Sequence, residues 1–219
     1  YFSWFHLQTT AAAQLAAGSD SFVFSAQAWA PVAGTNALSI RAAAIDLADA
    51  ITLSGVRSVT FSADGDLRLS GGNIVGVTGQ YRLGGALLSK GDIVLRAAQI
   101  YPTTMSTFSL VSDTKVRFEG NGAAASAPLS AGGELNVYAP VIEQTGVVRA
   151  PGGQIGLGCK SGGCPASAPY VKLIGGGNVA IAPTTSVTLA DGSITSVSLN
   201  GKLVPLGALE NGEGWYYPF

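Results

Sequence analysis

The residues best suited to chemistry are two cysteines in the glycine-rich stretch GLGCKSGGCPASAP. Cys159 and Cys164 lie five positions apart, and a short loop of this kind can close as a disulfide in an oxidising compartment. Free thiols are the second reading. A zinc site needs about four ligands, whereas the chain has one histidine and no further cysteine. We predict a disulfide between Cys159 and Cys164, and neither a metal nor another cofactor.

The one histidine, His6, lies among aromatic residues in YFSWFHL. A catalytic histidine needs a nucleophile or a carboxylate placed beside it by the fold. The neighbouring sequence suggests neither, so we interpret His6 as a structural residue.

Several acidic residues come in close pairs: Asp46 and Asp49, Asp64 and Asp66, and Glu210 and Glu213. Glycosidases use two carboxylates roughly 5 to 9.5 Å apart. The stretch SADGD at 62–66 superficially resembles a calcium loop, but it lacks the full set of spaced carboxylates. We interpret these acids as solvated turn residues. We assign no catalytic residues and predict that the protein is not an enzyme.

The composition excludes two classes of partner. Of the 219 residues, 47% are hydrophobic and only 11% are charged, with a net charge of −1. The 12 lysines and arginines are scattered singly, which argues against nucleic acid and against an anionic membrane surface. No apolar run reaches the roughly 18 residues of a membrane span. Thirty glycines, with abundant alanine, serine and threonine, are typical of secreted β proteins.

A nine-residue pattern recurs along the chain. It has apolar residues at its second and fourth places, a small residue at its sixth and isoleucine at its ninth. The copies are ALSIRAAAI (37–45), DLRLSGGNI (66–74), DIVLRAAQI (92–100), ELNVYAPVI (134–142) and, more weakly, SVTLADGSI (186–194).

This pattern predicts a strand that turns a corner. Places two, four and six share one face of a strand, whereas the step from six to nine is odd and requires a bend. Two short inward-facing strands joined at a small-residue corner describe a turn of a β-solenoid, and an antiparallel sandwich is the alternative. Turns of roughly 20 residues would give about 11 of them, in a rod on the order of 50 Å long.

The two ends differ from the middle. Residues 1–34 form an aromatic and alanine-rich capping or linking segment, and 35–219 form the solenoid domain. TTAAAQLAAGSD at 9–20 predicts a short helix or a loop packed on the first turn of the solenoid. Aromatic residues at both ends could cap the open edges or join copies head to tail into a filament. They are Tyr1, Phe2, Trp4 and Phe5, with Trp215, Tyr216, Tyr217 and Phe219.

Three stretches resemble a known family: LRAAQIYPTTMSTFSL (95–110), GGELNVYAPVIEQTGVVRAPGGQIGLG (132–158) and VTLADGSITSVSLNGKLVPLGALENGEGWYYP (187–218). They are similar to the filamentous haemagglutinin family, giant secreted β-helical adhesins of Gram-negative bacteria, over roughly residues 35–218. The resemblance implies a right-handed parallel β-helix, export to the cell surface or the medium, and a rod that serves adhesion or matrix formation. The aromatic start and the CKSGGC loop depart from the family pattern.

These observations together predict an all-β, right-handed parallel β-helix in a structural or adhesive rod, either on the bacterial surface or in an extracellular filament. The expected partners are further copies of the chain or the rest of a longer parent rod, and a host or matrix glycan. The alternative is a carbohydrate-binding or polysaccharide-cleaving β-helix. Acids and aromatic residues clustered on one outer sheet face would favour this alternative.

Overall fold

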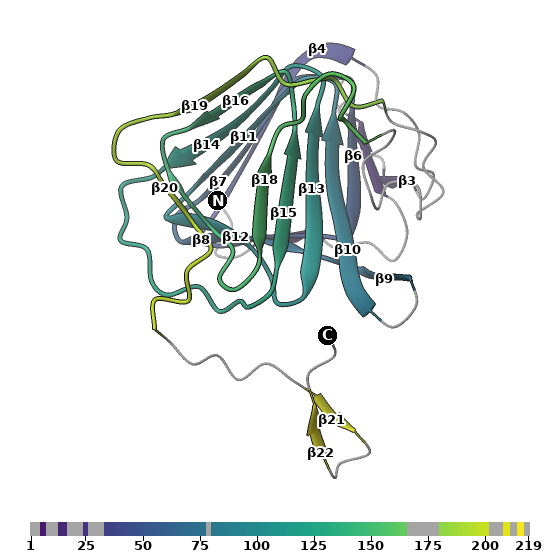
Figure 1. The fold of residues 1–219 in the computed structure, drawn as a ribbon. Helices are drawn as coiled ribbons and strands as arrows, with labels where there is room; N and C mark the ends of the chain where they lie inside the picture. The colour runs from purple at the N-terminus through teal and green to yellow at the C-terminus, as the bar shows by residue number, and fades with distance from the viewer. Residues whose placement is uncertain are drawn as a thin grey trace.

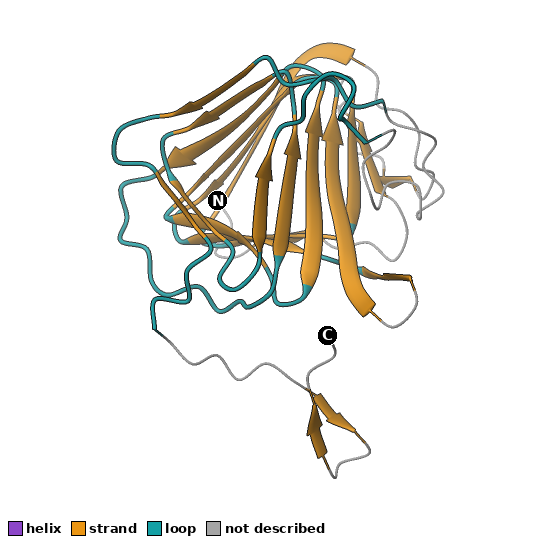
Figure 2. Ribbon diagram, in the orientation of Figure 1, coloured by secondary structure: helices purple, strands orange, loops and turns teal. Residues whose placement is uncertain are grey.

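The structure is a computed structural model that describes residues 33–72, 83–165 and 180–201 in full. It also describes the backbone of strands at 5–7, 13–16, 24–25, 73–77, 80–82, 208–210 and 214–216. Strands and loops make up all of these regions, and none of them is helical (Figure 2). The predicted all-β class is therefore confirmed. Within the described regions, no helix has the length and hydropathy needed to span a membrane.

Three sheets of parallel strands enclose the core (Figure 1). Sheet A contains β4 (Ala33–Ala42), β7 (Val56–Ala63), β11 (Asp92–Ala97), β14 (Lys115–Gly120), β16 (Val141–Gln144) and β19 (Ser186–Leu189). Sheet B contains β1 (Phe5–Leu7), β5 (Ile45–Ala48), β8 (Asp66–Ser70), β12 (Gln99–Pro102), β17 (Val147–Arg149) and β20 (Ile194–Ser196). The parallel strands of sheet C are β2 (Ala13–Ala16), β6 (Ala50–Ser54), β10 (Gln80–Ser89), β13 (Ser106–Ser112), β15 (Glu134–Tyr138) and β18 (Gln154–Leu157).

Three antiparallel pairings complete the described strands. At one end of sheet C, β3 (Phe24–Ser25) pairs with β2. Strand β9 (Asn73–Val77) pairs with the first half of β10. A separate hairpin joins β21 (Ala208–Glu210) to β22 (Gly214–Tyr216).

The chain passes through the sheets in the repeating order C, A, B. We call one such passage a level, so that β6, β7 and β8 form one level and β10, β11 and β12 the next. Each strand pairs with its counterpart one level away, as β7 pairs with both β4 and β11. In the part of the chain that the structure describes, each sheet holds six parallel strands, which is fewer than the predicted 11 or so turns. The β9–β10 hairpin and the long loops add residues to some levels, so these levels contain more residues than predicted.

The predicted corners are confirmed, although the copies of the pattern do not occupy one site. The copies at 37–45, 92–100 and 186–194 run from sheet A into sheet B. The copy at 134–142 runs from sheet C into sheet A, and the copy at 66–74 leaves sheet B for β9. This is why the copies are unevenly spaced along the sequence.

Inward positions stack directly on one another from level to level. In sheet A, Val59 pairs in register with both Leu38 and Ile93. In sheet B, Leu67 pairs with both Ile45 and Ile100. These six side chains are buried, and full burial of such a side chain contributes about 1.5–3 kcal/mol. The largest side chains of the interior are three phenylalanines, Phe61, Phe108 and Phe118.

The helix predicted within residues 9–20 is wrong, because Ala13–Ala16 forms strand β2. Gln14 and Leu15 pair in parallel with Thr52 and Leu53 of β6. Helix propensity is a weak local preference, and here strand β6 offers the same backbone groups hydrogen-bond partners in a sheet.

The aromatic residues of the two ends are not described as side chains. Tyr1, Phe2, Trp4, Tyr217 and Phe219 lie outside the described residues. Phe5 lies in β1, and Trp215 and Tyr216 lie in β22, each described by its backbone alone.

Candidate functional site

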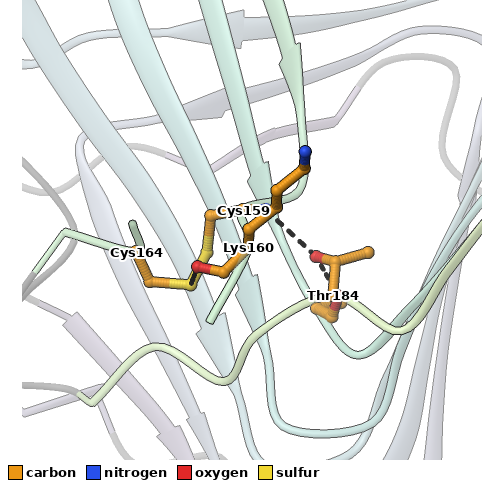
Figure 3. The surroundings of a disulfide bond; sticks show 5 residues. Cys159, Lys160, Cys164 and Thr184 are labelled. Carbon is orange, nitrogen blue, oxygen red and sulfur yellow. Dashed lines mark hydrogen bonds between the residues drawn. A yellow bond between two sulfur atoms is a disulfide. The ribbon is translucent and has the colours of Figure 1, made fainter. Parts of the chain in front are cut away.

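The two cysteines lie in the loop that leaves β18. Their sulfur atoms are 2.10 Å apart, as a disulfide, and their Cα atoms are 5.0 Å apart (Figure 3). Thr184 fixes the base of this loop, because its amide donates to the Cys159 carbonyl oxygen and its hydroxyl accepts from the Cys159 amide at 3.2 Å. The same hydroxyl donates to the Ala139 carbonyl oxygen at 2.7 Å. The loop is therefore attached to the level beneath it.

The acidic pairs have different surroundings. Asp46 and Asp49 are buried, so their interpretation as solvated turn residues is wrong. Asp64 is partly exposed and pairs with Arg41 at 3.0 Å. Among the described residues, no group of three or more histidine, cysteine, aspartate or glutamate side chains could hold a metal ion.

The remaining sequence candidates are described by backbone alone or lie outside the described residues. His6 lies in β1, with its Cα in register with that of Asp46. Glu210 lies in β21, and Glu213 is outside the described residues.

Sheet B lacks a strand in one level. After β14 the chain does not enter sheet B, and residues 121–133, which we call the inserted segment, lead directly to β15 in sheet C. Strand β12 therefore pairs with β17, through Ile100 and Val148, although their levels are not adjacent in the other two sheets.

Hydrogen bonds attach the inserted segment beside sheet B. At its start, Asn121 Nδ2 donates to the carbonyl oxygens of Ala63 and Asp64 at 2.9 and 2.8 Å. Near its end, the buried Ser130 Oγ donates to the Pro102 carbonyl oxygen at 2.5 Å. The segment is thus fixed at both ends to the levels that it crosses.

A polar network lies on the outer side of sheet B. Ile100 of β12 faces the core, so its neighbours Gln99 and Tyr101 point outward, yet they are only 0% and 2% exposed. Gln99 Nε2 and Tyr101 Oη donate to Asp66 Oδ2 at 3.2 and 3.1 Å. The backbone of Leu129 lies close enough to the Tyr101 hydroxyl to act on its pKa, which places the inserted segment beside this network. The network is consequently covered rather than solvated.

Burial changes the acidity of this network. The pKa of the Tyr101 hydroxyl is raised, chiefly because burial disfavours the phenolate and further because the negative Asp66 lies beside it. Close by in sheet B, Asp46 accepts from Arg68 Nη2 at 2.6 Å and from Ser70 Oγ at 2.5 Å. These contacts link β5 to β8.

The outer face of sheet A carries a different kind of polar surface. Glu143 of β16 accepts from Lys115 Nζ at 2.9 Å and from Arg117 Nη2 at 2.6 Å, both on β14. All three side chains are about a third exposed. Hydrogen bonds from Lys115 and then from Arg117 lower the pKa of the Glu143 carboxyl. Ion pairs of this exposed kind contribute little to stability.

The last level of the stack presents apolar residues to solvent. In β19, Val187 and Leu189 occupy the register of the buried Ile142 and Gln144, but they are 43% and 52% exposed. In β18, Ile155 is only partly buried against the core. The inward-facing column therefore reaches an end that the described residues leave open.

No family model, no curated protein and no solved structure matches this chain.

The sequence pointed to the cysteines and the acidic pairs. It did not point to Gln99 and Tyr101 of β12, or to Arg149 of β17. Gln99 and Tyr101 flank the core residue Ile100, and their outward position was readable from strand alternation. Their burial depends on residues 121–133, which no local pattern connects with them.

Proposed function

We propose that the chain is a rod segment of a secreted bacterial surface protein or extracellular filament, folded as a right-handed parallel β-helix. The repeating C, A, B order of three parallel sheets supports this fold. The stacked core supports a structural role, because each added level extends the same column of buried side chains. The resemblance to the filamentous haemagglutinin family agrees with both. We assign no catalytic role to any residue.

The exposed end of the core is the single observation that carries this proposal. Val187 and Leu189 have the register of interior residues but lie at the surface. An edge with unpaired backbone groups and apolar side chains is a template for another strand. A further level, supplied by a second copy or by the parent chain, would bury both residues.

A second copy that binds there would make a head-to-tail contact. Such a contact joins two different surfaces and does not close on itself, so it generates a filament. The expected partner is therefore the same chain, and the expected assembly grows with protein concentration.

Mass photometry over a concentration series, followed by negative-stain electron microscopy, tests the assembly. The informative variant is Val187→Lys combined with Leu189→Lys, and the matched control is Leu129→Lys. Leu129 is 86% exposed but lies on the inserted segment rather than on β19. We expect the wild type and the control to form fibres of uniform width and the double variant to remain short. Short, monodisperse particles of the wild type at every concentration would refute self-assembly and leave a segment of a longer rod.

The carbohydrate alternative gains one observation. Asp46, Asp66 and Tyr101 all lie on sheet B, which is the clustering of acids and an aromatic residue that would favour it. All three are at least partly buried, so a glycan would reach them only if the inserted segment moved. A glycan array and a reducing-end release assay with the purified chain test this candidate. Release of reducing ends that Asp66→Asn abolishes would replace the rod proposal with an enzyme.

A further inference from the structure

A small pocket lies between the inserted segment and the turn that follows β20. Its volume is about 170 Å³. Three separate parts of the chain line it: the inserted segment, the end of β17 with Pro151, and the turn 198–200. This volume is smaller than the ~300–1,000 Å³ of sites for drug-sized ligands, so it suits a molecule the size of one sugar or one amino acid.

One charged side chain lines this pocket. Arg149 of β17 follows the core residue Val148, so it points to the outer side of sheet B. The side chain is partly buried, and its Nε is buried without a hydrogen-bond partner. None of the ion pairs among the described residues involves Arg149.

An unpaired guanidinium in such a place is unusual. A buried polar group that lacks a partner costs roughly 1–3 kcal/mol, and more if it is charged. Among the described residues, no carboxylate lines the Arg149 pocket, so its electrostatic character is positive and its arginine can bind an anion.

The rest of the lining favours a ligand with further polar groups. Ser126 and Ser130 come from the inserted segment, and Ser198 and Asn200 come from the turn after β20. This turn is held in shape because the Asn200 amide donates to Ser198 Oγ at 3.0 Å. The apolar part of the wall consists of alanine, proline and Leu199, and it contains no aromatic ring.

We propose that this pocket binds a single carboxylate group of a small ligand. The guanidinium of Arg149 would donate through its two terminal nitrogens to the two carboxylate oxygens, and hydroxyl groups of the lining would bind the remainder of the ligand. This inference does not depend on the rod proposal, because Val187 and Leu189 do not line the pocket. The carboxylate could belong to an acidic sugar or to a peptide, and the two sources share the chemistry that Arg149 recognises.

Nuclear magnetic resonance of the full chain tests the site, with the Arg149 Nε–H signal as the readout in the wild type and the backbone amide signals of Ser198 and Asn200 as the readout in every variant. The probes are D-glucuronate for acidic sugars and N-acetylglycine for peptide carboxylates. D-glucose and N-acetylglycinamide are their neutral counterparts. We expect at least one acid to shift the Nε–H signal with a millimolar Kd, and both neutral compounds to leave it unchanged. The acid that binds more tightly identifies the source of the carboxylate.

Substitutions separate this site from general attraction of anions. Arg149→Ala should weaken binding at least about tenfold, and Arg149→Lys should weaken it less, since lysine keeps the charge but loses the fork. Arg96→Ala is the matched control, because Arg96 is an exposed arginine on β11 in sheet A. It should leave the Kd unchanged.

A pocket-filling variant guards against a folding defect in the arginine variants. Ser126 is exposed on the inserted segment, so Ser126→Trp can fill the pocket without disturbing the core. We expect it to abolish binding at an unchanged melting temperature. The proposal is overturned if neither acid shifts the Nε–H signal at tens of millimolar, or if Arg149→Ala and Ser126→Trp bind as the wild type does.

Discussion

The outer faces of sheets A and B begin from the same strand pattern and end in opposite environments. On sheet A, Glu143 lies between Lys115 and Arg117 with about a third of each side chain in solvent. On sheet B, Asp46 lies against Arg68 and is buried. Both carboxylates bridge two neighbouring strands. The difference shows that the burial of a face, rather than its residue types, determines how much its polar groups contribute to stability.

On sheet B, the inserted segment lies beside Tyr101, and Asp46 lies in register with His6 of the neighbouring strand β1. On sheet A, about a third of the Glu143 side chain remains in solvent. A polar side chain that remains in solvent exchanges hydrogen bonds to water for hydrogen bonds to protein, with little net gain in stability. A buried polar side chain must find its hydrogen-bond partners within the protein. Sheet B therefore carries polar groups that the fold holds in fixed positions, and this is the face on which we expect a ligand to bind.

Removing the buried carboxylate should have the largest effect. Asp46→Ala deletes the acceptor of the hydrogen bonds from Arg68 and Ser70, and we expect it to lower the free energy of unfolding by about 2–3 kcal/mol. Chemical denaturation at neutral pH measures this loss. A loss below that of the corresponding change on sheet A, Glu143→Ala, would contradict the contrast between the two faces.

The next effect concerns the covered tyrosine. Tyr101→Phe removes the hydrogen bond to Asp66, and we expect a loss of about 1 kcal/mol at neutral pH. The pKa of Tyr101 is raised in the folded state, so its contribution is complete below the unfolded pKa of about 10 and declines above it. In that alkaline range the wild type should lose about 1.4 kcal/mol per pH unit from this residue, and the variant should not.

Melting temperatures of both proteins between neutral and strongly alkaline pH provide the measurement. Subtracting the two curves removes the titration of the other tyrosines and of the lysines. Parallel curves would mean that Tyr101 is solvated in the folded protein, and thus that the inserted segment does not cover it.

The smallest effect is expected on sheet A. Glu143→Ala should cost less than about 1 kcal/mol, because its partners are exposed and water screens the pairs. The pKa of Glu143 is lowered in the folded state, so its contribution is present above the unfolded pKa and disappears as pH falls through the folded one. The melting temperatures of wild type and variant should therefore differ at neutral pH and become equal at acidic pH. A difference that persists at acidic pH, or that high salt does not reduce, would count against this account.

Much of the fold could be predicted because strand alternation is local. The odd step between the sixth and ninth places of the repeat placed a corner between β4 and β5 and between β11 and β12. It also identified Ile45 and Ile100 as inward residues, and both are buried. Where the signal was only compositional, as in the alanine-rich stretch that became β2, the prediction was wrong.

The candidate sites could not be predicted in the same way. Arg149 and Tyr101 look like ordinary outward residues of short strands, and only residues far away in sequence enclose them. Which sheet a strand joins, and whether a level omits one, depends on pairing between distant segments. The copies of the repeat show this limit, since one pattern occurs at corners between different sheets.

The omitted strand has a geometric consequence. Between β12 and β17, sheet B contains one strand fewer than sheets A and C contain over the same levels. Neighbouring strands are spaced ~4.8 Å apart, so this side of the stack is shorter by about one such step. The body is therefore wedge-shaped at this point, and its long axis bends toward sheet B. A fibre that repeated the wedge once per copy would coil rather than run straight, with a curvature set by thirteen residues that form no strand.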